Sequence, residues 1–176
     1  MTLDDLKNAL PDYAKDIKLN LGSVLTPEGA PGLTPTQLWG CAVASALTAR
    51  NPKVADAVLA AATQHLDPAQ LTAAKTAAAL MGMTNIYYRF TYLTGDPEYK
   101  TLPAKLRMNG IVTHGAPKVD FELWSLAASV VTGCATCVEA HEKTVRQHDI
   151  TREGVQSAAR IASVIHAAAV ALEAGA

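Results

Sequence analysis

The distribution of hydrophobic and polar positions along this chain favours helices throughout. Alanine dominates the apolar positions, and the strict alternation of apolar and polar residues that marks a half-buried strand is scarce. Capping signals agree, because Thr34, Asp67, Asp120 and Thr151 each stand immediately before a long apolar segment. We therefore predict an all-α fold without a strand. The predicted helices span residues 2–10, 11–21, 35–50, 52–65, 68–93, 121–131, 134–148 and 152–173.

Two stretches interrupt the helical pattern. A loop rich in proline and glycine is expected at residues 22–33, and a longer irregular stretch at residues 94–119. The chain has 176 residues, of which 49% are hydrophobic, so it is long enough to bury a sizeable core. We predict a single all-helical domain over residues 1–176.

The two groups of long helices resemble each other. A Leu-Trp pair begins at Leu38 and again at Leu123, an offset of 85 residues, and in each group a second helix and then a long alanine-rich helix follow. Chance similarity of alanine-rich helices is the alternative, and the repeated Leu-Trp pair argues against it. We infer an internal duplication of a three-helix unit over about 34–93 and 120–173.

Charge and hydropathy exclude several classes of partner. The formal net charge is -1 and no Lys/Arg-rich run exists, which argues against nucleic acid and anionic membranes. The acidic N-terminus lacks the features of a signal peptide. The apolar stretch 158–172 contains Arg160 and His166 and is short for a membrane span. We expect a cytoplasmic protein.

Three cysteines are too few for a disulfide framework. Cys134 and Cys137 form a C-x-x-C pair, which in a reducing compartment indicates redox chemistry or metal binding. Cys41 lies in a segment that is apolar on all sides, so we interpret it as a packing residue. Only the second of the two related units carries the pair and His141. At the offset of 85, the corresponding positions of the first unit are Ala49, Pro52 and Asp56.

The surroundings of the pair suit thiol chemistry. Gly133 breaks the preceding helix, so Cys134 is expected at the N-terminus of a new helix, with Cys137 and His141 on the same face. A helix N-terminus and a neighbouring imidazole both favour the thiolate, which is the nucleophile. A second cysteine can convert a sulfenic acid into a disulfide and so prevent further oxidation.

Other interpretations remain open at this point. In one interpretation the cysteines are inert small residues, and in another they bind zinc with His141 and either Glu122 or His148. Considered without the cysteines, His141 would be interpreted as a surface residue. Glu122 either complements the helix dipole in a first turn or accepts a proton from a histidine, and the sequence does not favour one over the other. His65, His114, His148 and His166 are interpreted as structural or surface residues, and residues 87–90 as core and interface aromatics around an arginine.

The chain resembles the alkylhydroperoxidase AhpD family within the carboxymuconolactone-decarboxylase-like superfamily, over nearly its whole length. Residues 10–21, 81–89 and 106–109 contribute to this resemblance. The most specific block is 121–142, which combines Glu122, both cysteines and His141 at the family's spacing.

The resemblance implies an all-α fold of two related three-helix halves, with the C-x-x-C at a helix N-terminus, and a homotrimer. It implies that Cys137 attacks the peroxide, that Cys134 resolves the sulfenic acid as a Cys134–Cys137 disulfide, and that Glu122 and His141 form a proton relay. It also implies reduction by dihydrolipoamide carried on a 2-oxo acid dehydrogenase component, and electron transfer to the peroxiredoxin alkyl hydroperoxide reductase C. No bound metal, haem or flavin is implied.

One position departs from the family pattern. Family members can carry a histidine immediately before the second cysteine, where this chain has Thr136. A hydroxyl can donate or accept a hydrogen bond but is no base near neutral pH. We therefore expect weaker thiol activation here than in a relative with the histidine.

The leading hypothesis is an antioxidant thiol peroxidase that reduces alkyl hydroperoxides and hydrogen peroxide. Decarboxylase-like chemistry of the wider superfamily is a second hypothesis, although that chemistry does not need the cysteine pair. The non-enzymatic alternatives are a redox-sensing interaction module and a zinc-binding helical module.

Overall fold

Most helices of this protein begin where the sequence supplies a capping side chain. The computed structural model describes residues 1–175. The hydroxyl of Thr34 accepts the backbone N–H of Gln37, whose side-chain oxygen accepts the N–H of Thr34 in return. Asp67 and Gln70 form the same reciprocal capping box. Local hydrogen bonding thus explains why these helices start where they do.

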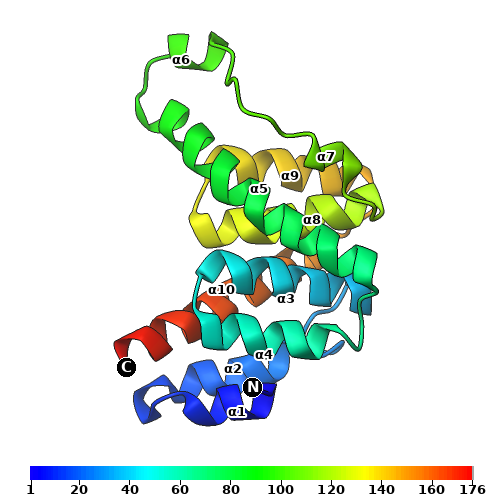
Figure 1. Ribbon diagram of the computed structural model, residues 1–176, viewed down its shortest axis with the longest axis vertical. Coiled ribbons are helices and arrows are strands. Elements are labelled where there is room, and N and C mark those ends of the chain that lie inside the picture. The colour runs from blue at the N-terminus through cyan, green and yellow to red at the C-terminus, as the bar shows by residue number, and fades with distance from the viewer. Residues whose placement is uncertain (176) are drawn as a thin grey trace.

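The predicted all-α fold is confirmed, since the described part of the chain contains helices and connecting segments but no strand (Figure 1). The helices are α1 (Leu3–Ala9), the 3₁₀-helix η1 (Asp12–Ala14), α2 (Lys15–Val24), α3 (Pro35–Ala49), α4 (Pro52–Ala62), α5 (Pro68–Leu93), α6 (Glu98–Thr101), α7 (Gly110–Thr113), α8 (Lys118–Thr132), α9 (Ala135–Gln147) and α10 (Arg152–Ala174).

Several details differ from the predictions, among them the predicted helix 52–65, which ends at Ala62. The predicted helix 11–21 is a 3₁₀ turn followed by α2, and the irregular stretch 94–119 contains the single-turn helices α6 and α7. The prediction that Asp120 is a helix cap is wrong, because α8 already begins at Lys118. Asp120 lies in the first turn of α8, where it accepts a hydrogen bond of 2.9 Å from the side-chain amide of Gln37. This carboxylate therefore contributes to a contact between α3 and α8 that local sequence patterns do not reveal.

The centre of the molecule is the pair α3 and α8, against which α5 and α10 pack. Gly40 permits the close approach of these two helices: a Cβ atom there would lie 2.0 Å from the indole of Trp124, which is fully buried. In Figure 1, α1 and α2 lie beside α4 at one end, and α6 lies at the opposite end. Helix α10 is long and apolar enough to cross a membrane by length and composition, but half of its most apolar window is buried inside the protein.

The junctions α3–α4 and α8–α9 have the same backbone form. Arg50 and Gly133 end α3 and α8 in the left-handed conformation, with φ of 61° and 67°, and the next residues, Asn51 and Cys134, cap α4 and α9. This register has an offset of 83 residues. It matches Cys134, Cys137 and His141 with Asn51, Val54 and Val58 rather than with Ala49, Pro52 and Asp56. The internal duplication and the single domain stay predictions.

Candidate redox-active site

The α8–α9 junction places Cys134 at the start of a helix by a specific turn. The backbone N–H of Gly133 donates to the carbonyl of Val130 at 3.2 Å, and that of Cys134 donates to the carbonyl of Ser129 at 3.3 Å. This is the Schellman pattern, which needs a left-handed residue at the position of Gly133. The predicted C-x-x-C at a helix N-terminus is therefore confirmed.

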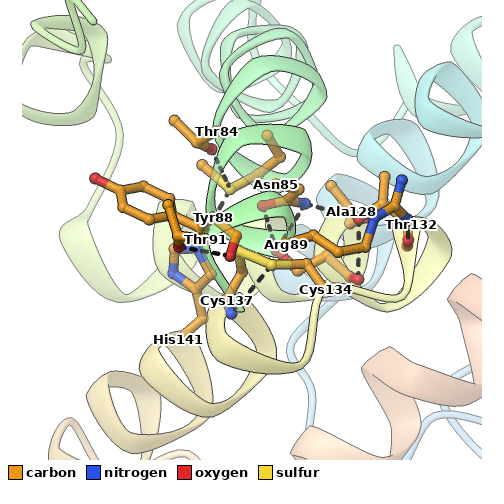
Figure 2. Close-up of a disulfide and its surroundings, with 12 residues drawn as sticks. Thr84, Asn85, Tyr88, Arg89, Thr91, Ala128, Thr132, Cys134, Cys137 and His141 are labelled. Carbon is orange, nitrogen blue, oxygen red and sulfur yellow. Dashed lines mark hydrogen bonds between the residues drawn. A yellow bond between two sulfur atoms is a disulfide. The ribbon is translucent and has the colours of Figure 1, made fainter. Parts of the chain in front are cut away.

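Cys134 and Cys137 are joined by a disulfide on the first turn of α9 (Figure 2). The sulfur of Cys134 also caps the helix, accepting the backbone N–H of Cys137 at 3.4 Å. Cys134 is fully buried, whereas Cys137 retains 7% exposure and lines a cavity. Cys137 is therefore the cysteine of the pair that borders the cavity, whereas Cys134 has no exposed surface.

His141, one turn after Cys137, is paired with Glu122 across the α8–α9 interface. Nδ1 of His141 lies 2.7 Å from a carboxylate oxygen of Glu122, and their side chains are 17% and 14% exposed. The structure thus brings together the four residues singled out in the sequence. Glu122 contacts the histidine. Because α8 begins four residues before Glu122, this carboxylate does not lie in the first turn, where it would complement the helix dipole.

The other ring nitrogen of His141, Nε2, lies 3.3 Å from the thioether sulfur of Met81 on α5. Met81 is 2% exposed, and Thr84 donates a hydrogen bond of 3.6 Å to the same sulfur. A carboxylate and a thioether sulfur are hydrogen-bond acceptors, so each ring nitrogen of His141 faces an acceptor atom. These two contacts fix the orientation of the imidazole ring in the cavity beside Cys137.

A buried polar network fixes the end of α8 to α5 (Figure 2). The side-chain amide of Asn85 donates to the hydroxyls of Ser129 and Thr132, at 3.1 and 2.9 Å. The guanidinium of Arg89 donates to the backbone carbonyl of Thr132. Because Thr132 directly precedes Gly133, these bonds hold the turn that presents the cysteines. Satisfied buried networks of this kind make a site rigid.

The cavity beside Cys137 has a volume of about 340 Å³ and is mainly apolar. Met81 and Tyr88 of α5, Met108 and Ile111 from the irregular stretch, and Cys137 and His141 of α9 line it. A larger cavity of about 640 Å³ lies elsewhere, between the ends of α3 and α8, α5 and α10, and contains none of the cysteines. We assign the candidate site to the smaller cavity, the site cavity, because Cys137 and His141 line it.

Sequence patterns did not identify the residues that α5 and the irregular stretch contribute. Residues 87–90 were expected in the core or at an interface, yet none of them is buried, and Tyr88 lines the site cavity. Met81 and Met108 carry no local signal beyond hydrophobicity. The segment 94–119, which spacing alone describes as irregular, supplies part of the cavity wall.

The remaining histidines and Cys41 have structural surroundings. The ring of His114 stacks on Phe121 with centroids 4.0 Å apart, and burial lowers its pKa, an effect that the nearby Glu122 charge opposes. His65 stacks on Trp39, whereas His148 and His166 are exposed. Cys41 is fully buried, and burial raises the pKa of its thiol far above the ordinary value, with the Asp120 charge adding to this. Cys41 is therefore unsuited to be a nucleophile.

The donor set for a metal is incomplete around the cysteines. Within residues 1–175 no group of three or more His, Cys, Asp or Glu side chains is placed to hold a metal ion. His148, one of the two alternative fourth ligands of the zinc hypothesis, lies with Nδ1 2.9 Å from the backbone carbonyl of Thr144. The zinc hypothesis receives no support from this geometry.

Comparison with known proteins places the chain in a family. Residues 97–176 match the carboxymuconolactone decarboxylase family. A protein of Rhodospirillum centenum called alkyl hydroperoxide reductase AhpD is 56% identical over 174 residues, covering 99% of this chain and 92% of the relative. Proteins of the same name from Bradyrhizobium sp. and Brucella suis are each 49% identical, covering 100% and 99% of this chain and 96% and 98% of the relatives. The chain belongs to the alkyl hydroperoxide reductase AhpD family.

Proposed function

We propose that this protein is an antioxidant thiol peroxidase that reduces alkyl hydroperoxides and hydrogen peroxide through a Cys134/Cys137 dithiol–disulfide cycle. The observation that carries the proposal is the disulfide whose Cys137 lines an apolar cavity beside the His141–Glu122 pair. The name shared by the relatives supports the same chemistry.

In the proposed reaction, the thiolate of Cys137 attacks one oxygen of the hydroperoxide and the O–O bond breaks. Cys137 becomes a sulfenic acid, and the departing alkoxide takes a proton and leaves as an alcohol. The thiolate of Cys134 then attacks the sulfenic sulfur, water leaves, and the Cys134–Cys137 disulfide forms. The cycle consumes two thiols and one hydroperoxide and yields one disulfide, one alcohol and one water.

His141 is the group best placed to supply the proton to the departing alkoxide. It lines the same cavity as Cys137, and the Glu122 carboxylate fixes its ring from the other side. Within the same proposal, Met81 orients the second ring nitrogen.

The reductant and the partners are further parts of the proposal, supported by the family relationship. Dihydrolipoamide on a 2-oxo acid dehydrogenase component would return two electrons to the disulfide by thiol exchange at the more accessible Cys137. A peroxiredoxin of the alkyl hydroperoxide reductase C type would accept electrons from the reduced pair. The protein would act as a cytoplasmic homotrimer without a bound metal, haem or flavin.

Steady-state NADH consumption tests the proposal. The assay couples dihydrolipoamide dehydrogenase and lipoamide to tert-butyl hydroperoxide, in the presence of a chelator, for wild type, Cys134→Ser, Cys137→Ser and the buried control Cys41→Ser. We expect turnover in wild type and Cys41→Ser, and only background in the other two variants. Equal turnover in Cys137→Ser and wild type would refute the proposal, as would no turnover by reduced wild type.

A further inference from the structure

A second cavity adjoins the site cavity. It has a volume of about 320 Å³, lies between the C-terminal part of α5, α6 and the start of α9, and shares Tyr88 and Thr136 with the site cavity. We call it the side groove. Thr136 is exposed and directly precedes Cys137, so a flexible chain lying in the side groove and crossing this small side chain arrives at the reactive sulfur.

The side groove is lined mainly by aromatic and aliphatic side chains. Tyr87, Tyr88, Tyr99 and Leu102 contribute to its walls. Leu102 is 58% exposed and Tyr99 is 39% exposed, although both are large and largely apolar. Neighbouring apolar side chains left in contact with water are typical of ligand-binding or interaction surfaces. The groove therefore suits a hydrocarbon chain better than a polar ligand.

Lys100 of α6 is the one charged residue among those that line the side groove. Its ammonium lies 6.0 Å from the centroid of the Tyr92 ring and, in the described part of the chain, has no carboxylate within ion-pair distance. Helix α6 lies at the outer end of the molecule, beyond α9 in Figure 1. The groove thus combines an apolar wall with a free positive charge on α6 and the redox pair on α9.

We propose that the side groove binds the hydrocarbon chain of a long-chain fatty acid hydroperoxide, with its carboxylate at Lys100 and its hydroperoxide at Cys137. This inference rests on the proposed peroxidase function and names a substrate class for it. The reaction is unchanged: the hydroperoxide becomes a hydroxy fatty acid, water leaves, and the pair is oxidised to the disulfide.

Two features separate this occupant from other ligands of the site. A short hydroperoxide such as tert-butyl hydroperoxide fills only the site cavity and makes no use of Lys100. The lipoyl arm of the proposed reductant ends in a neutral amide, so it offers no carboxylate to Lys100. An effect that depends on both the carboxylate and the long chain therefore reports the fatty acid alone.

Turnover with three substrates at fixed dihydrolipoamide tests the inference. The substrates are linoleic acid 13-hydroperoxide, its methyl ester and tert-butyl hydroperoxide, all below their micelle-forming concentrations. In Lys100→Gln we expect KM for the free acid to rise about two- to five-fold, the size of an exposed ion pair, with kcat unchanged. The ester and tert-butyl hydroperoxide should be unaffected. Lys75→Gln, an exposed lysine that lines the other, larger cavity, is the matched control and should change nothing.

A second variant tests the path of the chain. Leu102→Glu places a negative charge in the groove wall, so it should raise KM for the free acid and the ester while leaving tert-butyl hydroperoxide unchanged. The inference is overturned if Lys100→Gln affects all three substrates equally or none of them, or if Leu102→Glu does not distinguish long from short substrates.

A binding measurement keeps this inference separate from the proposed function. Calorimetric titration of the oxidised protein with oleate should show binding that weakens in Lys100→Gln, and methyl oleate should bind the two proteins equally. If wild type fails to turn over tert-butyl hydroperoxide, the peroxidase proposal fails, and oleate binding still decides whether the groove accepts a fatty acid. The groove proposal is overturned if oleate does not bind, or if Lys100→Gln binds oleate as tightly as wild type does.

Discussion

The two helix junctions α3–α4 and α8–α9 have the same backbone form, but the side chains that follow the cap lie in different surroundings. In the first, Asn51 caps α4 by accepting the N–H of Val54 at 3.1 Å, and its amide donates to Glu173 at 2.8 Å. The positions that follow on the same face, Val54 and Val58, are fully buried. In the second, Cys134 caps α9, and the following positions, Cys137 and His141, line a cavity.

What covers each junction explains the difference. Helix α1 packs against α4, whose Val54 and Val58 are fully buried. Helix α9 instead packs against α5, and residues 108–111 of the irregular stretch stand over it and leave a cavity of about 340 Å³. The same cap geometry is thus followed by fully buried side chains on α4 and by cavity-lining side chains on α9. The same difference yields predictions that separate stability from activity.

The largest difference should concern the fifth residues of α8 and α3, Glu122 and Trp39. Glu122→Gln removes the charge that holds the His141 ring, so we expect turnover to fall by about 10²-fold or more, the range of general acid–base catalysis. At the register of 83 residues its counterpart is Trp39, which stacks on His65. Trp39→Leu should lower stability and leave turnover intact. Glu139→Gln, exposed on α9, is the control. Full activity of Glu122→Gln would show that the pair has no catalytic part.

Next in size is the effect of the cap residues on stability. Asn51→Ala removes a cap and a buried side-chain hydrogen bond, so we expect a loss of about 2 kcal/mol in the free energy of unfolding with turnover unchanged. Urea denaturation of the reduced protein measures this, with the exposed Asn20→Ala as control. Cys134→Ser should stay within about 0.5 kcal/mol of reduced wild type, because serine is a good cap, while losing activity. A stable Asn51→Ala protein would contradict the assignment of the cap.

A smaller effect is expected at the left-handed residues. Gly133→Ala should destabilise the protein by about 1 kcal/mol, because the open space around Gly133 leaves only the backbone conformation to resist a side chain. Arg50→Gly relieves the same strain at the other junction and should be neutral or stabilising by up to about 1 kcal/mol. Urea denaturation of both reduced variants compares the signs. If both substitutions changed the free energy of unfolding in the same direction, the two turns would not be equivalent.

The smallest effect concerns Thr136, which directly precedes Cys137. Thr136→His adds a titratable ring next to Cys137, and the rate of alkylation of the reduced protein by iodoacetamide at pH 7 should rise roughly two- to five-fold, the size of an exposed charge interaction. Mass spectrometry of the Cys137 peptide over time measures the rate. Thr144→His, further along α9, is the control. An alkylation profile identical to that of wild type would refute the expectation that Thr136 weakens thiol activation.

Local signals explain how much of this molecule was predictable. The caps Thr34, Asp67 and Thr151 are confirmed as the starts of α3, α5 and α10, because a capping side chain bonds to a backbone N–H three residues later. The placement of Cys134, Cys137 and His141 on one face of a helix was also predictable from local signals, because residues three and four positions apart lie on the same helical face. Asp120 was wrongly predicted as a cap because its partner, Gln37, lies 83 residues away.

The sequence by itself therefore determined the long helices, the position of the C-x-x-C at a helix start, and the alignment of Cys134, Cys137 and His141. Only the tertiary structure decided that Glu122 contacts His141, that Met81 completes the ring's surroundings, and that Cys137 rather than Cys134 lines a cavity. The physical reason is how far apart in the sequence the interacting residues lie. Helix hydrogen bonds join residues three or four positions apart, whereas the cavity depends on how α5, α9 and the irregular stretch pack together.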